Sequence, residues 1–133
     1  MANQIVPESH LDILRKRSFA HVATLGPNGE LHSSPVWFDF DGEFIYFSTT
    51  KARQKYKNLK ANKKVALSLL DPDNPYRYLE IRGEVEQFIP DEGNKFIDKL
   101  AKKYLSLEHY PFDSVDDERV IIKIKPLKTS KMG

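Results

Sequence analysis

Seven basic residues lie between positions 51 and 64, directly after a short run of hydroxyl side chains. The basic residues are Lys51, Arg53, Lys55, Lys57, Lys60, Lys63 and Lys64. No acidic residue interrupts them, and Ser48, Thr49 and Thr50 precede them. The fork of Arg53 can bind two oxygens of a phosphate, and Lys55 adds a second positive charge. This pattern predicts a phosphate site or, in the simpler interpretation, a solvated basic helix face.

The elements that carry these residues are compatible with a phosphate site. Residues 44–50 (FIYFSTT) have the β-branched and aromatic composition of a strand, and residues 51–64 predict a helix. The first turn of a helix presents unpaired N–H groups and the positive end of the helix dipole. A strand that runs into a helix can therefore hold an anion at the junction.

Other kinds of catalytic site find little support in the sequence. The four histidines show no metal-ligand spacing, and the chain has no cysteine, so we expect no metal site. There is no G-x-S-x-G nucleophile motif, no G-x-G-x-x-G and no P-loop. If the protein is an enzyme, we expect a bound cofactor to supply the chemistry.

Two further segments are candidates for ligand contacts. Pro35 lies inside a predicted strand, where proline indicates an edge or a bulge, and bulges often lie beside sites. Tyr76 and Tyr78 alternate on one face of another strand, so their rings can stack on a flat ligand or belong to a subunit interface.

The pattern along the chain predicts a mainly β fold, with three helices beside six antiparallel strands. The predicted strands are 19–26, 31–40, 44–50, 65–70, 76–88 and 120–124. Tight turns join the first three as a meander, and Gly83 within the fifth predicts a bulge or a close backbone approach. The predicted helices begin near Ser9, Lys51 and Pro90. We expect the sheet to close as a small barrel, and the tail from Pro126 to be frayed.

Length and composition set the class of protein. The chain has 133 residues, of which 40% are hydrophobic and 30% charged, as in one globular domain spanning 1–133. No segment resembles a membrane span or a secretory signal, so we expect a cytoplasmic protein that does not bind membranes.

Two motifs together resemble a known family. The sequence contains S-T-x-x-x-R-x-K-x-x-N-L, followed by D-P-x-x-P-Y-R-Y-L-E-I-R-G. This combination resembles the pyridoxamine 5′-phosphate oxidase-like flavin and deazaflavin oxidoreductases, in particular the branch that uses the deazaflavin coenzyme F420. The resemblance covers nearly the whole chain and implies the FMN-binding split β-barrel fold.

The resemblance also implies a homodimer with cofactor sites at its interface. It implies that Arg53 and Lys55 bind the cofactor phosphate, and that the partner's site is completed by Tyr76 and Tyr78. The other implied contacts are His32, Ser34, Pro35, Val36 and Trp37 along the ring system, and Ser48, Thr49 and Thr50 along the ribityl phosphate. The chain lacks the C-terminal substrate-phosphate segment of true pyridoxamine phosphate oxidases. Both FMN and F420 carry the phosphate that R-x-K binds, and the surplus lysines suit the acidic tail of F420.

Three functional hypotheses follow. The first is an oxidoreductase that transfers hydride between F420, or alternatively FMN, and a small organic substrate. The second is a non-catalytic carrier of a flavin, or of another planar ligand such as haem. The third, nucleic-acid binding by the basic helix, is disfavoured because Tyr56 belongs to the apolar face of that helix.

Overall fold

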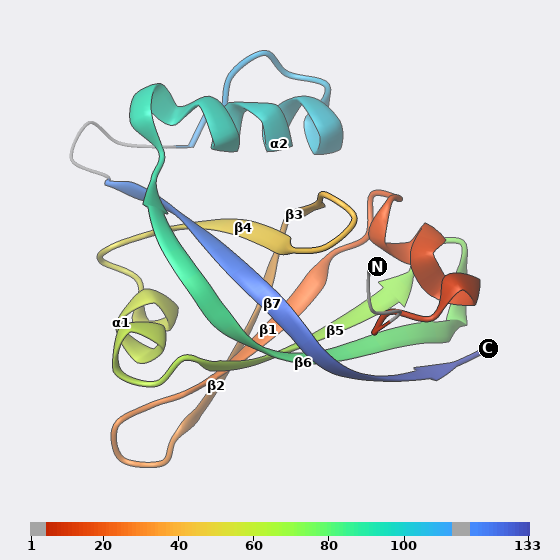
Figure 1. Cartoon of the computed structure of the whole chain (residues 1–133). Coiled ribbons are helices and arrows are strands. Elements are labelled where there is room, and N and C mark those ends of the chain that lie inside the picture. The colour runs from red at the N-terminus through yellow and green to blue at the C-terminus, as the bar shows by residue number, and fades with distance from the viewer. Residues whose placement is uncertain (1–4, 113–117) are drawn as a thin grey trace.

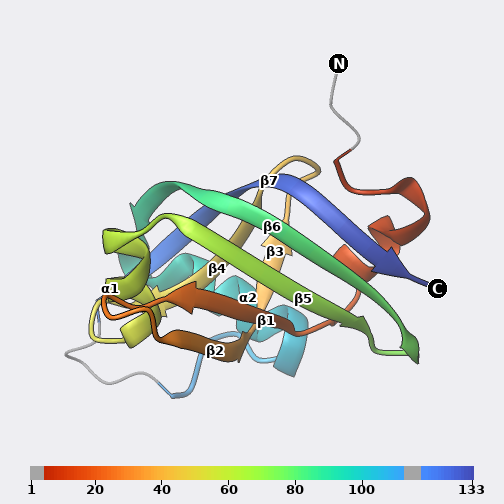
Figure 2. The same cartoon turned by 90° about the horizontal axis from the view of Figure 1, so that it is seen from below.

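The computed structural model describes residues 5–112 and 118–133, in which a single antiparallel sheet curls around a hydrophobic core (Figure 1, Figure 2). The strands are β1 (Ala20–Leu25), β2 (Leu31–Val36), β3 (Phe38–Phe40), β4 (Ile45–Thr50), β5 (Lys64–Asp71), β6 (Asn74–Pro90) and β7 (Arg119–Met132). The helices are the 3-10 helices η1 (Glu8–Leu14) and η2 (Glu92–Asn94) and the α-helices α1 (Gln54–Ala61) and α2 (Lys95–Leu105). Within the described residues, no helix has the length and apolar character needed to span a membrane.

The order of the strands explains the curl of the sheet. The order is β2-β1-β5-β6-β7-β4-β3, and every pairing is antiparallel. The two outermost strands, β2 and β3, are separated in the chain by Trp37 alone. The sheet must therefore bend until its two edges approach each other, which gives a half-barrel. The mainly β fold with flanking helices is confirmed.

The predicted number of six strands is wrong, because the described residues form seven. The predicted strand 31–40 breaks at Trp37 into β2 and β3, which lie at opposite edges of the sheet. The predicted three-strand meander is wrong for the same reason. β2 pairs with β1, and β3 pairs with β4, but β2 and β4 do not pair. The two hairpins are instead brought together by the curl.

The C-terminal tail is also ordered, contrary to the frayed tail expected from the sequence. β7 continues to Met132 and pairs with β6 from Val120 to Met132, with two register shifts. The hydroxyl of Thr129 donates to the carbonyl of Ile5, and a ring nitrogen of His10 lies 3.1 Å from the carbonyl oxygen of Met132. The N-terminal segment therefore holds the end of the chain in place.

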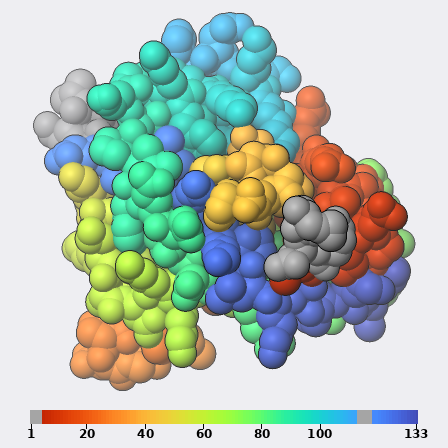
Figure 3. Space-filling model, in the orientation of Figure 1, coloured from red at the N-terminus to blue at the C-terminus, as the bar shows by residue number. Residues whose placement is uncertain are grey.

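The core lies on the concave face of the sheet. Along β6 the side chains of Leu79, Ile81 and Val85 are buried, as their alternation predicts. The pairing of β6 with β7 shifts register between Arg82 and Gly83, which confirms the predicted bulge. Figure 3 shows the atoms of α2 along the top of the molecule and those of α1 on its left side. The site described next is lined by residues from β4 and from both of these helices.

Candidate functional site

The junction between β4 and α1 forms a positively charged floor. Arg53 is the N-cap residue of α1, and no side chain of the described residues caps the helix. The backbone turns at this point through a hydrogen bond from the Arg53 N–H to the Thr50 carbonyl. The first N–H groups of the helix are therefore left to an external acceptor. The structure thus places the predicted strand-to-helix junction where the sequence motif puts it.

Lys55 is the most buried basic residue of this junction, with 7% of its surface exposed. Among residues 5–112 and 118–133, no carboxylate forms an ion pair with it. Burial lowers the pKa of the Lys55 ammonium, and the nearby charges of Arg53 and Arg119 lower it further. A buried cation of this kind gains from an anionic ligand.

Arg119 is a third cation at the site, and the sequence did not single it out. It begins β7 and lies opposite Thr50 of β4. Its Nη1 donates to the hydroxyl of Ser48 at 3.3 Å, and its guanidinium lies 4.8 Å from the ring centroid of Tyr110. The β4–β7 pairing brings this residue beside Arg53 and Lys55. We call these three residues the cationic floor.

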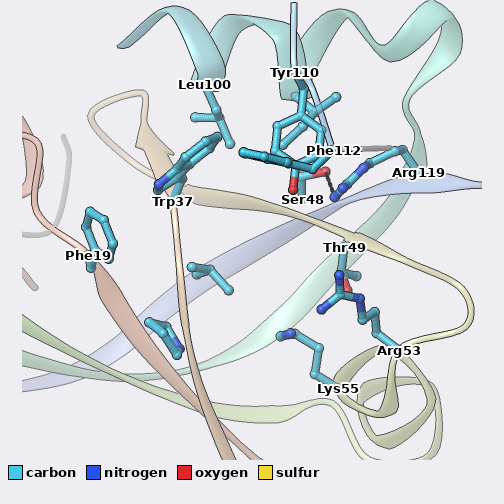
Figure 4. Close-up of a pocket in the computed structure, with 13 residues that line it drawn as sticks. Phe19, Trp37, Ser48, Thr49, Arg53, Lys55, Leu100, Tyr110, Phe112 and Arg119 are labelled. Atoms are coloured by element: carbon cyan, nitrogen blue, oxygen red, sulfur yellow. Dashed lines mark hydrogen bonds between the residues drawn. The ribbon is translucent and has the colours of Figure 1, made fainter. Parts of the chain in front are cut away.

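Thr49 supplies a polar atom that is left for a ligand. Thr49 is 3% exposed, and its buried Oγ1 has no hydrogen-bond partner within the described part of the chain. Figure 4 shows Thr49 beside Arg53, with Lys55 below them. A buried hydroxyl without a partner is costly, so this atom is suited to bond a ligand oxygen.

A pocket of about 250 Å³ joins the cationic floor to a wall of rings (Figure 4). It is lined by Phe19, Pro35, Val36, Trp37, Ser48, Thr49, Arg53, Lys55, Ile97, Leu100, Tyr110, Phe112 and Arg119. We call Phe19, Trp37, Tyr110 and Phe112 the aromatic wall. The pocket therefore has one cationic and hydroxyl-bearing side and one apolar, aromatic side. Such a site fits a molecule that combines a flat ring with an anionic tail.

The structure brings seven of the twelve predicted site residues to the pocket. These are Pro35, Val36, Trp37, Ser48, Thr49, Arg53 and Lys55. Thr50 is buried next to the junction but does not line the pocket. His32 and Ser34 also lie outside the lining, although their buried Nδ1 and Oγ atoms have no hydrogen-bond partner among the residues described.

The two tyrosines of β6 do not reach this pocket. Tyr76 is 80% exposed, and Tyr78 pairs with Leu70 and Met132 in the sheet. Their role in a site would require a second chain. No cluster of three or more His, Cys, Asp or Glu side chains that could hold a metal ion occurs among the described residues.

Comparison with known proteins identifies the family to which the chain belongs. The model of the family described as pyridoxamine 5′-phosphate oxidase matches residues 6–133. The chain belongs to the pyridoxamine 5′-phosphate oxidase family. This confirms the resemblance inferred from the two sequence motifs. No curated protein sequence matches the chain.

Solved structures resemble the chain over most of its length. A structure of an F420 reductase is 42% identical, with a TM-score of 0.85, and the match covers 94% of this chain and 98% of that one. The resemblance to the F420 branch is thereby confirmed. A putative pyridoxamine 5′-phosphate oxidase from Listeria innocua is 20% identical over 93% of this chain and 95% of that one, with a TM-score of 0.71. General stress protein 26 from Bacillus anthracis is 22% identical over 94% and 92%, with a TM-score of 0.69. The last two share the fold.

Proposed function

We propose that this family member is a cytoplasmic, homodimeric oxidoreductase that binds F420, or alternatively FMN, and reduces a small organic substrate. The observation that carries the proposal is the cationic floor with the unpartnered Oγ1 of Thr49 at one end of an aromatic-walled pocket, all within the described residues. The family and the 42% identical F420 reductase support an oxidoreductase. When bound, the cofactor supplies a hydride to an electron-poor carbon of the substrate, and a proton from solvent completes the reduction.

The cationic floor suits the phosphate of either cofactor. Arg53 can bind two phosphate oxygens, Lys55 supplies a buried charge, and Thr49 can donate its hydroxyl. Burial lowers the pKa of Lys55 and so disfavours its charged form. A bound phosphate would stabilise that charged form. The role of the protein in this proposal is to bind and orient the cofactor with its ring toward Trp37.

The size of the pocket supports a site shared between two chains. At about 250 Å³, it is smaller than the roughly 300–1,000 Å³ typical of small-molecule sites. The outer face of the sheet carries an apolar row in which Leu70 and Met132 flank Tyr78. Leu70 and Met132 are 45% and 55% exposed, and Tyr76 nearby is 80% exposed. We propose that this face meets a second copy, and that Tyr76 and Tyr78 complete the partner's site.

The decisive experiment is a titration of the purified protein with F420 and, separately, with FMN, followed by absorption spectra. We expect saturable spectral changes with one cofactor per chain, and tighter binding of F420. Absence of binding by both cofactors would overturn the proposal. Binding without oxidation of the reduced cofactor by a panel of quinone and nitro acceptors would instead indicate a carrier.

The shared site has its own test. Tyr76→Ala and Tyr78→Ala should weaken cofactor binding, although neither residue lines the pocket of its own chain. A chain that remains monomeric in sedimentation and binds the cofactor fully would refute the shared site and leave the phosphate site intact.

A further inference from the structure

The segment that follows α2 forms the outer part of the pocket. α2 ends at Leu105, and its C-cap residue Ser106 has the left-handed backbone conformation that stops the helix (φ 59°). Residues 107–112, which we call the cover segment, then pass over the pocket without regular secondary structure. They supply Tyr110 and Phe112 to the aromatic wall, and these rings pack edge to face at 5.4 Å.

One carboxylate of α2 holds the cover segment at two points. Oδ1 of Asp98 accepts a hydrogen bond from the Tyr110 backbone N–H at 2.8 Å. Oδ2 of Asp98 lies 3.0 Å from Nδ1 of His109, which precedes Tyr110 in the chain. Asp98 itself does not line the pocket. It therefore acts on the pocket only through the backbone and side chain that it fixes.

The residue fixed in this way connects the two sides of the pocket. The ring of Tyr110 meets Trp37 edge to face, with 5.7 Å between ring centroids and an interplanar angle of 89°. The guanidinium of Arg119 lies over the same ring at 4.8 Å. Figure 4 shows Tyr110 and Phe112 above Ser48, facing Leu100 and Trp37. Displacement of Tyr110 would therefore remove one ring from the aromatic wall. Arg119 of the cationic floor would lose its contact with that ring.

We propose that Asp98 is a positioning residue that clasps the cover segment, and that the clasped segment determines how tightly the pocket holds a planar, conjugated ring. This inference rests on the proposed function, because the ring is that of the cofactor. It adds that ring affinity and phosphate affinity are separable. The first depends on Asp98 through Tyr110, and the second on the cationic floor.

The test uses two probes that divide the cofactor, riboflavin for the ring and inorganic phosphate for the tail. Asp98→Ala removes both bonds of the clasp, whereas Asp98→Asn keeps an oxygen that can accept from the Tyr110 N–H. Tyr110→Leu removes the ring and leaves the clasp. Glu108→Gln is the matched control, because Glu108 lies in the same segment but contacts Lys102, at 4.0 Å. Hydrogen exchange of the Tyr110 amide and fluorescence of Trp37 report the cover segment without any ligand.

We expect Asp98→Ala to speed exchange of the Tyr110 amide, to change Trp37 emission and to weaken riboflavin binding about tenfold, a loss typical of an aromatic contact. Phosphate affinity should stay within about twofold, as expected for a group outside the charged contacts. Tyr110→Leu should weaken riboflavin binding to a similar extent, while the amide of residue 110 stays protected from exchange. Asp98→Asn should bind riboflavin nearly as tightly as the wild-type chain.

Three results would overturn the inference. These are unchanged amide exchange and Trp37 emission in Asp98→Ala, unchanged riboflavin affinity despite a released segment, and failure of the wild-type chain to bind riboflavin at all. Failure of the proposed function has a different signature. The wild-type chain would then bind neither phosphate nor either cofactor, while Tyr110 amide exchange and Trp37 fluorescence would still report the clasp without ligand.

Discussion

The indole of Trp37 lies parallel to the ring of Tyr104, with 5.3 Å between ring centroids and 5° between their planes. Trp37 is the single residue between β2 and β3, and Tyr104 lies in the last turn of α2. The hydroxyl of Tyr104 donates to the carbonyl of Ser18 at 2.6 Å, just before β1. One ring thus fixes α2 against the point where the two edges of the sheet meet, and Trp37 is held at the pocket.

The first prediction concerns this stack. Tyr104→Phe keeps the ring and should leave Trp37 emission nearly unchanged, whereas Tyr104→Ala should shift it and lower stability by about 1–3 kcal/mol, as loss of a half-buried packed side chain does. Urea unfolding and fluorescence measure both effects. Equal behaviour of the two variants would show that the stack does not position the indole.

The second prediction concerns the cationic floor. Arg53→Ala, Lys55→Ala and Arg119→Ala should each weaken cofactor binding by about 1–3 kcal/mol, the usual cost of losing a charged hydrogen-bond partner. Lys57→Ala is the matched control, because Lys57 lies on the same helix but outside the pocket. Affinities come from spectral titration at fixed ionic strength. If Lys57→Ala weakens binding as much as Arg53→Ala, general charge attraction explains the effect and the assigned phosphate site is wrong.

The third prediction is a pH dependence of the cover segment. The carboxylate of Asp98, with a smaller effect from Glu108, raises the pKa of His109 above its ordinary 6.5. Lys102 is the nearby cation, and it pairs with Glu108. Because the folded pKa is raised, the charged contact with Asp98 is present at and below the ordinary pKa. It is lost as the pH rises through the raised value.

Trp37 emission should therefore change in one step as the pH increases through the raised pKa of His109. His109→Gln should remove the step, and Glu108→Gln should keep it at a slightly lower pH. A step that persists in His109→Gln would assign the transition to another group.

The fourth prediction concerns the bulge between β6 and β7. A Cβ added at Gly83 would collide with the backbone carbonyl oxygen of Lys125 and come within 3.1 Å of the Ile124 side chain. Gly83→Ala should therefore lower the free energy of unfolding by about 1–3 kcal/mol, as overpacking does. Ser68→Ala, on the exposed face of β5, should change it by no more than about 0.5 kcal/mol. Denaturant unfolding provides the comparison, and an unchanged midpoint for Gly83→Ala would show that the strands can separate to admit a methyl group.

The sequence alone determined the local features of this protein. Ser48, Thr49, Arg53 and Lys55 lie within eight consecutive positions, so strand and helix propensity alone bring them to one junction. The alternation along β6 likewise predicted its buried face, and Gly83 predicted the bulge. Two motifs were specific enough to indicate the family by their residue types and spacing alone.

Contacts between distant segments were decided only by the tertiary structure. Arg119 reaches the cationic floor because β7 pairs with β4, and Tyr110 reaches Trp37 because Asp98 holds the segment after α2. The break of the predicted strand 31–40 at Trp37 follows from the same cause, since the sheet must close on itself there. Propensity and spacing describe neighbours along the chain, whereas strand order and closure depend on which apolar faces are buried together.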